Sequence, residues 1–87
     1  MKSLAKGIVD SAAFLELSGE DVVDPDCAVR ALESIAHCLQ HASEAEKLAV
    51  LEYCHEQAAG VDDDRRKDFY EHFGDAMGLT HVGDRLQ

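Results

Sequence analysis

The chain has 87 residues, a length typical of one domain, and so short a chain buries only roughly 60–65% of the surface that its unfolded form exposes. A large internal active-site cavity would compete with so small a core, which favours a function at the surface. Eighteen Asp and Glu against eight Lys and Arg give a formal net charge of −10. Such a surface repels phosphates and anionic membranes and attracts basic proteins, so we expect no binding to nucleic acid or membranes.

The first predicted helix covers residues 3–17. Its apolar positions are Leu4, Ile8, Val9, Ala12, Phe14 and Leu15. They form a broad arc, and Gly7 weakens the helix by roughly 1 kcal/mol relative to Ala. Part of this arc would be free to pack against a second neighbour.

The second predicted helix, residues 24–42, has the clearest helical pattern in the chain. Asp24 can cap its N-terminus, and Pro25 falls at the first helical position, where a missing N–H costs nothing. Its apolar residues recur at three- and four-residue steps: Ala28, Ala31, Leu32, Ile35, Leu39 and Ala42. We therefore expect this helix to be the element against which the others pack.

Two further helices are predicted over residues 44–59 and 63–77. Ser43 and Glu46 have the spacing of a capping box, and Gly60 and Gly78 are suited to ending the two helices. The inner positions predicted for the third helix are Leu48, Val50, Leu51, Cys54 and Ala58, and those for the fourth are Phe69, Tyr70, Phe73, Ala76 and Met77. The sequence thus predicts an all-α bundle of about four short helices, with a domain over residues 1–79 and a flexible tail over 80–87.

The chain has an odd number of cysteines, Cys27, Cys38 and Cys54, and no CxxC pair, which is atypical of a secreted domain held together by disulfides. The N-terminal residues lack the uninterrupted apolar run of a signal peptide, and no stretch approaches the roughly 20 apolar residues that span a bilayer. We therefore expect a reduced, cytoplasmic protein.

An acidic stretch joins the first two predicted helices and is the candidate partner-binding surface. Residues 7–46 hold nine acids and a single base, Arg30. The exposed acids expected to meet a partner are Glu16, Glu20, Asp21 and Asp26. A calcium loop does not fit, because position 12 counted from Asp21 is Leu32 instead of the required Glu. Capping and solubility are the plainer interpretation of these acids.

Tyr53 is a fifth candidate contact. Its position among Glu46, Glu52 and Glu56 suggests an exposed aromatic anchor in an acidic surround. It is equally expected to lie flat over a neighbouring helix.

Metal-binding and catalytic patterns receive little support. Cys38, His41, Cys54 and His55 have the ligand types of a zinc site, yet helical geometry points Cys38 and His41 in different directions. The His55-Glu56 pair lacks the second histidine of an HExxH motif, because position 59 is Ala. We predict no metal, no cofactor and no catalytic residue.

In length, helical content and acidity the chain resembles the small immunity proteins that neutralise bacterial nuclease toxins by covering a basic enzyme. The segment with a tyrosine pair and a proline that those proteins place on the toxin has no counterpart here, so no residue role is carried over.

Three hypotheses follow for the function. The first is an acidic helical interaction module that binds a basic protein, in the manner of an inhibitor or immunity protein. The second is a homodimeric structural or assembly protein, because a small domain gains stability by burying another apolar face. A small metal-binding protein ranks last.

Overall fold

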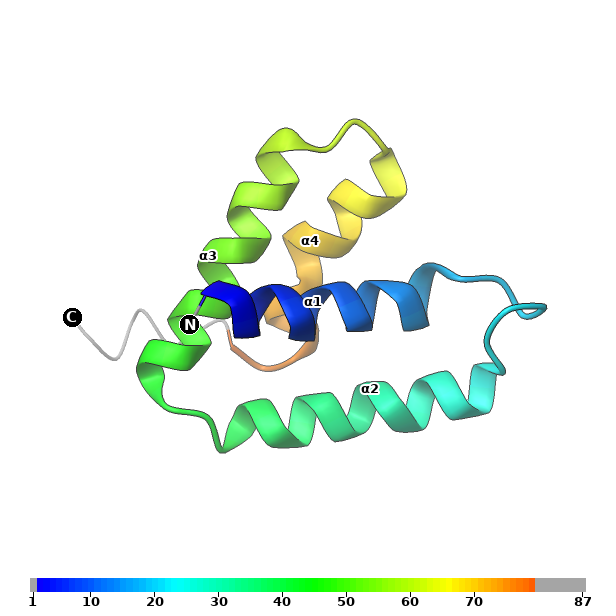
Figure 1. Ribbon diagram of the computed structural model, residues 1–87, viewed down its shortest axis with the longest axis horizontal. Coiled ribbons are helices and arrows are strands. Elements are labelled where there is room, and N and C mark those ends of the chain that lie inside the picture. The colour runs from blue at the N-terminus through cyan, green and yellow to red at the C-terminus, as the bar shows by residue number, and fades with distance from the viewer. Residues whose placement is uncertain (1, 80–87) are drawn as a thin grey trace.

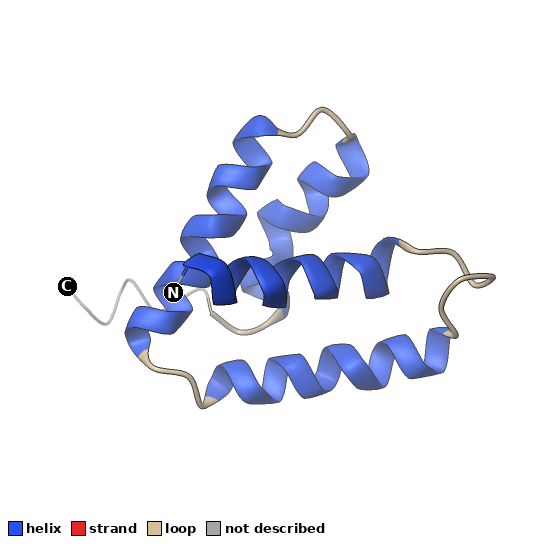
Figure 2. Cartoon of the chain, viewed as in Figure 1, coloured by secondary structure: helices blue, strands red, loops and turns tan. Residues whose placement is uncertain are grey.

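The computed structural model describes residues 2–79, which form four α-helices and no strand. The helices are α1 (Lys2–Leu17), α2 (Pro25–Gln40), α3 (Glu44–Gly60) and α4 (Asp64–Ala76), packed as one body (Figure 2). The predicted all-α bundle is confirmed, and each predicted helix boundary lies within two residues of the observed one. The tail predicted over 80–87 lies outside the described residues.

α1 occupies the centre of the fold. It contacts all three other helices and lies between α2 on one side and the α3–α4 pair on the other (Figure 1). α2 packs mainly against α1, and its buried residues are Ala28 and Leu39. The expectation that α2 organises the bundle is therefore wrong: its single apolar stripe serves one neighbour, whereas the broad arc of α1 serves three.

α1 buries its small side chains, and two of its large ones face solvent. The buried residues are Ala5, Val9, Ala12 and Ala13. Small side chains let the backbones of α3 and α4 approach closely. Leu4 and Phe14, both members of the broad apolar arc predicted for this helix, are 66% and 55% exposed.

The contact between α3 and α4 depends on Gly74. A Cβ added there would lie 2.6 Å from Leu51 Cδ2, so any larger residue would force the Leu51 side chain to move. Beside this contact, Phe69, Tyr70, Phe73 and Met77 are buried as predicted, whereas Ala76 is exposed. Phe73, at 2% exposed, is among the largest fully buried side chains of the described core.

Polar caps fix the starts of α2 and α3. The Asp24 carboxylate accepts a hydrogen bond from the backbone N–H of Cys27 at 3.1 Å. Ser43 and Glu46 form the predicted capping box, with mutual side-chain to backbone hydrogen bonds of 2.9 and 3.1 Å. The starts of α2 and α3 are thus encoded locally, as the sequence indicated.

The end of α4 is closed by Gly78, which has a φ of 75° that only glycine adopts without strain. The Leu79 N–H donates to the Gly74 carbonyl at 2.8 Å, and the Leu79 side chain is completely buried. Gln40 Nε2 then donates to the Met77 carbonyl at 2.6 Å. This hydrogen bond ties the C-terminal end of α2 to the turn that follows α4.

We expect Phe73→Ala to lower the free energy of unfolding by about 3–5 kcal/mol, because it leaves a cavity in the core. The apolar pattern of α2 places Ile35 in the middle of its inner stripe, where a loss of about 2–5 kcal/mol would be usual, but Ile35 is only partly buried. We expect Ile35→Ala to cost about 1–2 kcal/mol. Urea denaturation measures both, and equal losses would contradict this assignment of the core.

Candidate functional site

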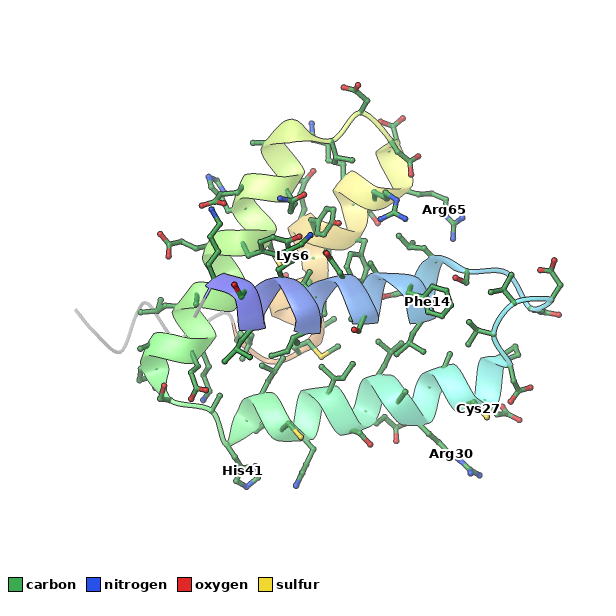
Figure 3. The ribbon with its side chains drawn as sticks, in the orientation of Figure 1. Lys6, Phe14, Cys27, Arg30, His41 and Arg65 are labelled. Carbon is green, nitrogen blue, oxygen red and sulfur yellow. The ribbon has the colours of Figure 1, made fainter. Side chains whose placement is uncertain are left out.

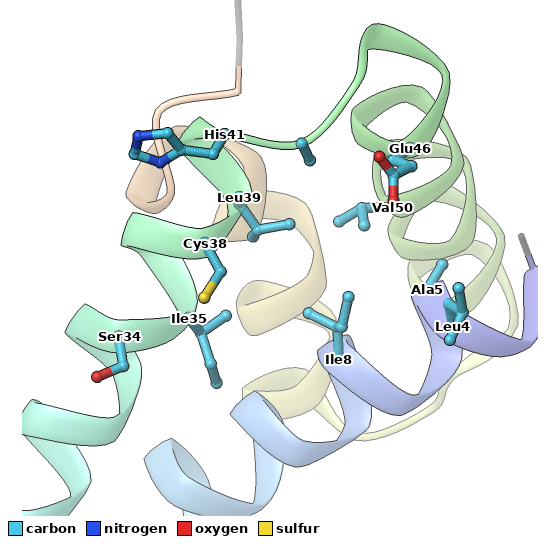
Figure 4. Close-up of a pocket in the computed structure, with 11 residues that line it drawn as sticks. Leu4, Ala5, Ile8, Ser34, Ile35, Cys38, Leu39, His41, Glu46 and Val50 are labelled. Carbon is cyan, nitrogen blue, oxygen red and sulfur yellow. The ribbon is translucent and has the colours of Figure 1, made fainter.

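An apolar groove lies between α1, α2 and the start of α3, and we call it the α1–α2 groove. It encloses about 560 Å³, within the roughly 300–1,000 Å³ typical of binding sites. Figure 4 shows Ile8, Ile35, Leu39 and Val50 directed into the same space from the three helices. Leu4, Ala5, Ser34, Cys38, His41, Ala42 and Glu46 complete its lining.

The groove exists because α2 is held closely only along part of its length. Its floor is part of the core, since Ala5, Leu39 and Val50 are each at most 3% exposed. Its rim is open, since Leu4 and Cys38 are exposed and Ile8 and Ile35 only partly covered. The result is an apolar surface that no described residue of the chain fills.

The polar groups of the groove lie at its rim. Hydrogen bonding with Ser43 lowers the pKa of Glu46, with the larger effect from the Ser43 backbone N–H and the smaller from its side chain. The Glu46 carboxylate therefore stays charged at neutral pH. His41 Nδ1 lies 3.0 Å from the His37 carbonyl oxygen, which occupies that ring nitrogen. No Lys or Arg of residues 2–79 lines the groove, so Glu46 is its charged group.

The predicted contact acids lie together in sequence around the connection between α1 and α2. Glu16, Glu20, Asp21 and Asp26, here called the acidic turn, are all exposed. The turn is ordered by hydrogen bonds from the Val22 and Val23 N–H groups to the Gly19 carbonyl, at 2.9 and 3.0 Å. Within the described part of the chain, none of the four acids forms an ion pair.

Tyr53 is buried and is no exposed anchor, which corrects the first of its two sequence-based alternatives. Its side chain is 5% exposed, and its hydroxyl donates a 2.8 Å hydrogen bond to Asp10 Oδ1 on α1. Lys6 Nζ donates to the other oxygen of Asp10 at 2.9 Å. Burial alone would raise the pKa of Asp10, but the hydrogen bonds from Lys6 and Tyr53 outweigh it and hold the pKa below its usual value.

The sequence missed this network because Asp10 and Tyr53 are 43 positions apart. Helical spacing alone predicts the orientation of Tyr53 only relative to its own helix. The polar pocket beside the network, of about 380 Å³, also includes Phe14, Gln57 and Arg66. Its polar lining consists mainly of side chains that already serve the α1–α3 contact.

The cysteines and histidines do not converge on a metal site. No group of three or more potential ligands comes together within residues 2–79. Cys38 lines the α1–α2 groove, whereas Cys54 is buried beside α4 in a separate part of the molecule. Burial raises the pKa of Cys54 to about 11, which makes it a poor nucleophile.

The groove itself was not predicted. Leu4 and Ile8 belong to the apolar arc predicted for the first helix, and the observed position of α2 leaves their row partly open. The signal in the sequence was the broad apolar arc of α1, which indicated a second apolar surface without saying what covers it.

We expect Tyr53→Phe to lower the free energy of unfolding by about 1 kcal/mol at pH 7, because it removes a donor to a charged carboxylate. The lowered pKa of Asp10 stabilises the folded state above the ordinary carboxyl pKa of about 3.9, and this contribution is lost as the pH falls through the lowered value. The difference in free energy of unfolding between the wild-type protein and Tyr53→Phe, measured by urea titration, should therefore shrink at about pH 2–3.

Tyr70→Phe is the matched control, because Tyr70 is equally buried but its hydroxyl makes no hydrogen bond within the described chain. A pH-independent loss in Tyr53→Phe, or an equal loss in Tyr70→Phe, would contradict the assigned network.

Thiol accessibility gives a second prediction for the native protein. Cys27 and Cys38 are exposed, whereas Cys54 is buried with a raised pKa, so alkylation at pH 8 should modify Cys27 and Cys38 in the native protein and Cys54 only on unfolding. Cys27 should react more slowly than a free thiol, because a hydrogen bond with Asp24 raises its pKa. Mass spectrometry of the protein alkylated with and without denaturant gives the number of modified cysteines. Rapid modification of all three would place Cys54 outside the core.

Comparisons of the chain with protein-family models, with curated proteins and with solved structures find no match. None of the helices in residues 2–79 has both the length and the apolar character needed to cross a membrane. The site geometry is therefore what supports an inference about function.

Proposed function

We propose that the protein is a small acidic interaction module that binds a basic partner protein through the acidic turn. The observation that supports this proposal is the set of four exposed carboxylates in the acidic turn, none of which is paired with a base of the described chain. Unpaired surface charge of one sign attracts a complementary partner and suppresses self-association.

Exposed apolar side chains occur in the same part of the chain. Phe14 is in the last turns of α1, Val22 in the connection and Val29 near the start of α2, and each is more than half exposed. Figure 3 shows Phe14 directed away from the helix axis beside the connection. Large apolar groups near charged ones are typical of interfaces, in which an apolar centre is surrounded by a polar rim.

Inhibition of a basic enzyme by covering its surface is one form that this function takes. It needs no catalytic residue, and the sequence shows no recognisable pairing of a nucleophilic side chain with a general base. Tyr53 is no longer part of the proposed surface, because it is buried against α1.

A homodimer is the second candidate, and the open α1–α2 groove is the observation that favours it. Its apolar lining is the kind of surface that a second copy could cover. Sedimentation across a range of concentrations separates the two, since a monomer at high micromolar concentration excludes the dimer.

Charge reversal of the acidic turn is the main test. Affinity capture from native extract with the wild-type protein supplies the partner, whose binding rate is then followed at increasing salt. We expect the rate to fall roughly tenfold or more, because screening shortens from about 10 Å at 0.1 M to about 3 Å at 1 M. Glu20→Lys with Asp21→Lys should lower the rate at low salt and leave the circular dichroism spectrum unchanged.

Asp62→Lys with Glu71→Lys is the control, since it changes the net charge equally at exposed positions away from the acidic turn. A rate that is indifferent to salt, or two double variants with equal effects, would mean that the acidic turn serves solubility alone. Asp24 is left unchanged because its loss would remove the cap of α2.

A further inference from the structure

The α1–α2 groove has the dimensions of a short helix. Its α2 wall runs from Ser34 to Leu39, a span of roughly 8 Å at 1.5 Å per residue, and His41 and Ala42 extend it beyond the end of the helix. Two turns of a second helix would fill this length. Such a helix would place apolar side chains at positions i, i+3 or i+4, and i+7 against Ile8, Ile35 and Leu39, which is the usual form of helix-in-groove recognition.

The charge around the groove determines which kind of helix fits. Glu46 is the charged side chain in its lining, and it lies at the end formed by α3. The bases of α1 are engaged elsewhere, Lys2 with Glu56 at 3.3 Å and Lys6 with Asp10 at 2.9 Å. Arg30 of α2 points away from α1 (Figure 3). An anionic amphiphile would thus meet a carboxylate and no Lys or Arg among the described lining residues, whereas a helix with Lys or Arg beside its apolar row would meet a complementary charge.

A second copy of the chain fits less well. Two copies would each bring a net charge of −10. The most exposed large apolar residues of the described chain, Leu4, Phe14, Val22 and Val29, also do not form one row at helical spacing. Residues 2–79 therefore do not present, among these most exposed side chains, the apolar helix face that the groove would take.

We propose that the α1–α2 groove binds a basic amphipathic helix of a partner protein, with its apolar row on Ile8, Ile35 and Leu39 and a Lys or Arg at Glu46. This inference rests on the proposed function and specifies the part of the basic partner that is recognised. The acidic turn then attracts the partner, and the groove holds its helix.

The test uses two synthetic 14-residue helical peptides with the same leucine row, one with lysines and the other with glutamates at the remaining positions. Binding to the full chain is measured by fluorescence anisotropy. Alkylation of Cys38, which lines the groove, is followed by mass spectrometry, with exposed Cys27 on the same helix as internal control. We expect the lysine peptide to bind at least tenfold more tightly and to slow alkylation of Cys38 but not of Cys27.

Substitutions of Leu4 and Val29 locate the binding site without changing the charge of the protein, and Glu46→Gln then tests the charge itself. Leu4→Gln alters an exposed residue of the groove rim, and Val29→Gln alters an equally exposed apolar residue outside it. We expect Leu4→Gln to weaken binding of the lysine peptide at least fivefold and Val29→Gln to leave it unchanged. Glu46→Gln should weaken it as well, because Gln keeps the capping box and removes only the charge.

Different failures separate this inference from the proposed function. Binding of the lysine peptide that leaves Cys38 unprotected and is unaffected by Leu4→Gln would overturn the groove and leave the acidic turn as the contact. Equal binding of both peptides would overturn the choice of a basic helix. Protection of Cys38 in the protein alone, increasing with its concentration, would identify a second copy as the occupant and overturn the inference.

Discussion

The packing of three helices around α1 is the constraint on which the rest of this structure depends. An 87-residue chain has few large side chains available for a core, and α1 meets α3 and α4 with alanines and Val9. α4 approaches α3 closely at Gly74, where an added Cβ would collide with the Leu51 side chain. The larger residues Leu4 and Ile8 are then left for the side that faces α2, where they border the groove.

The unequal support of α2 follows from this arrangement. α3 and α4 are joined to α1 through buried aromatic side chains and the Asp10–Tyr53 hydrogen bond, whereas α2 contributes two fully buried residues. Its C-terminal end is held by the hydrogen bond from Gln40 to the Met77 carbonyl. The helix with the clearest sequence pattern is therefore the least embedded one, and its incomplete contact with α1 creates the apolar groove.

The two proposed contact surfaces have different physical roles. The acidic turn carries charge that acts over a distance comparable to the screening length and therefore governs the rate of encounter. The groove offers apolar area that acts only on contact and therefore governs how long a partner stays bound. The groove lies at the start of α1 and the end of α2, and the acidic turn lies at the opposite ends of the same two helices.

Local chemistry encoded in the sequence determined the number, type and limits of the helices. Asp24, Ser43 and Gly78 act within a few residues of their own positions, so their roles were readable without the fold. The neighbours of each helix decide instead that Tyr53 is buried, that the groove is open and that α1 is central. A helical pattern states that a residue is apolar on one side, but only the tertiary structure decides whether a neighbour covers that side, and at Leu4 and Phe14 none does.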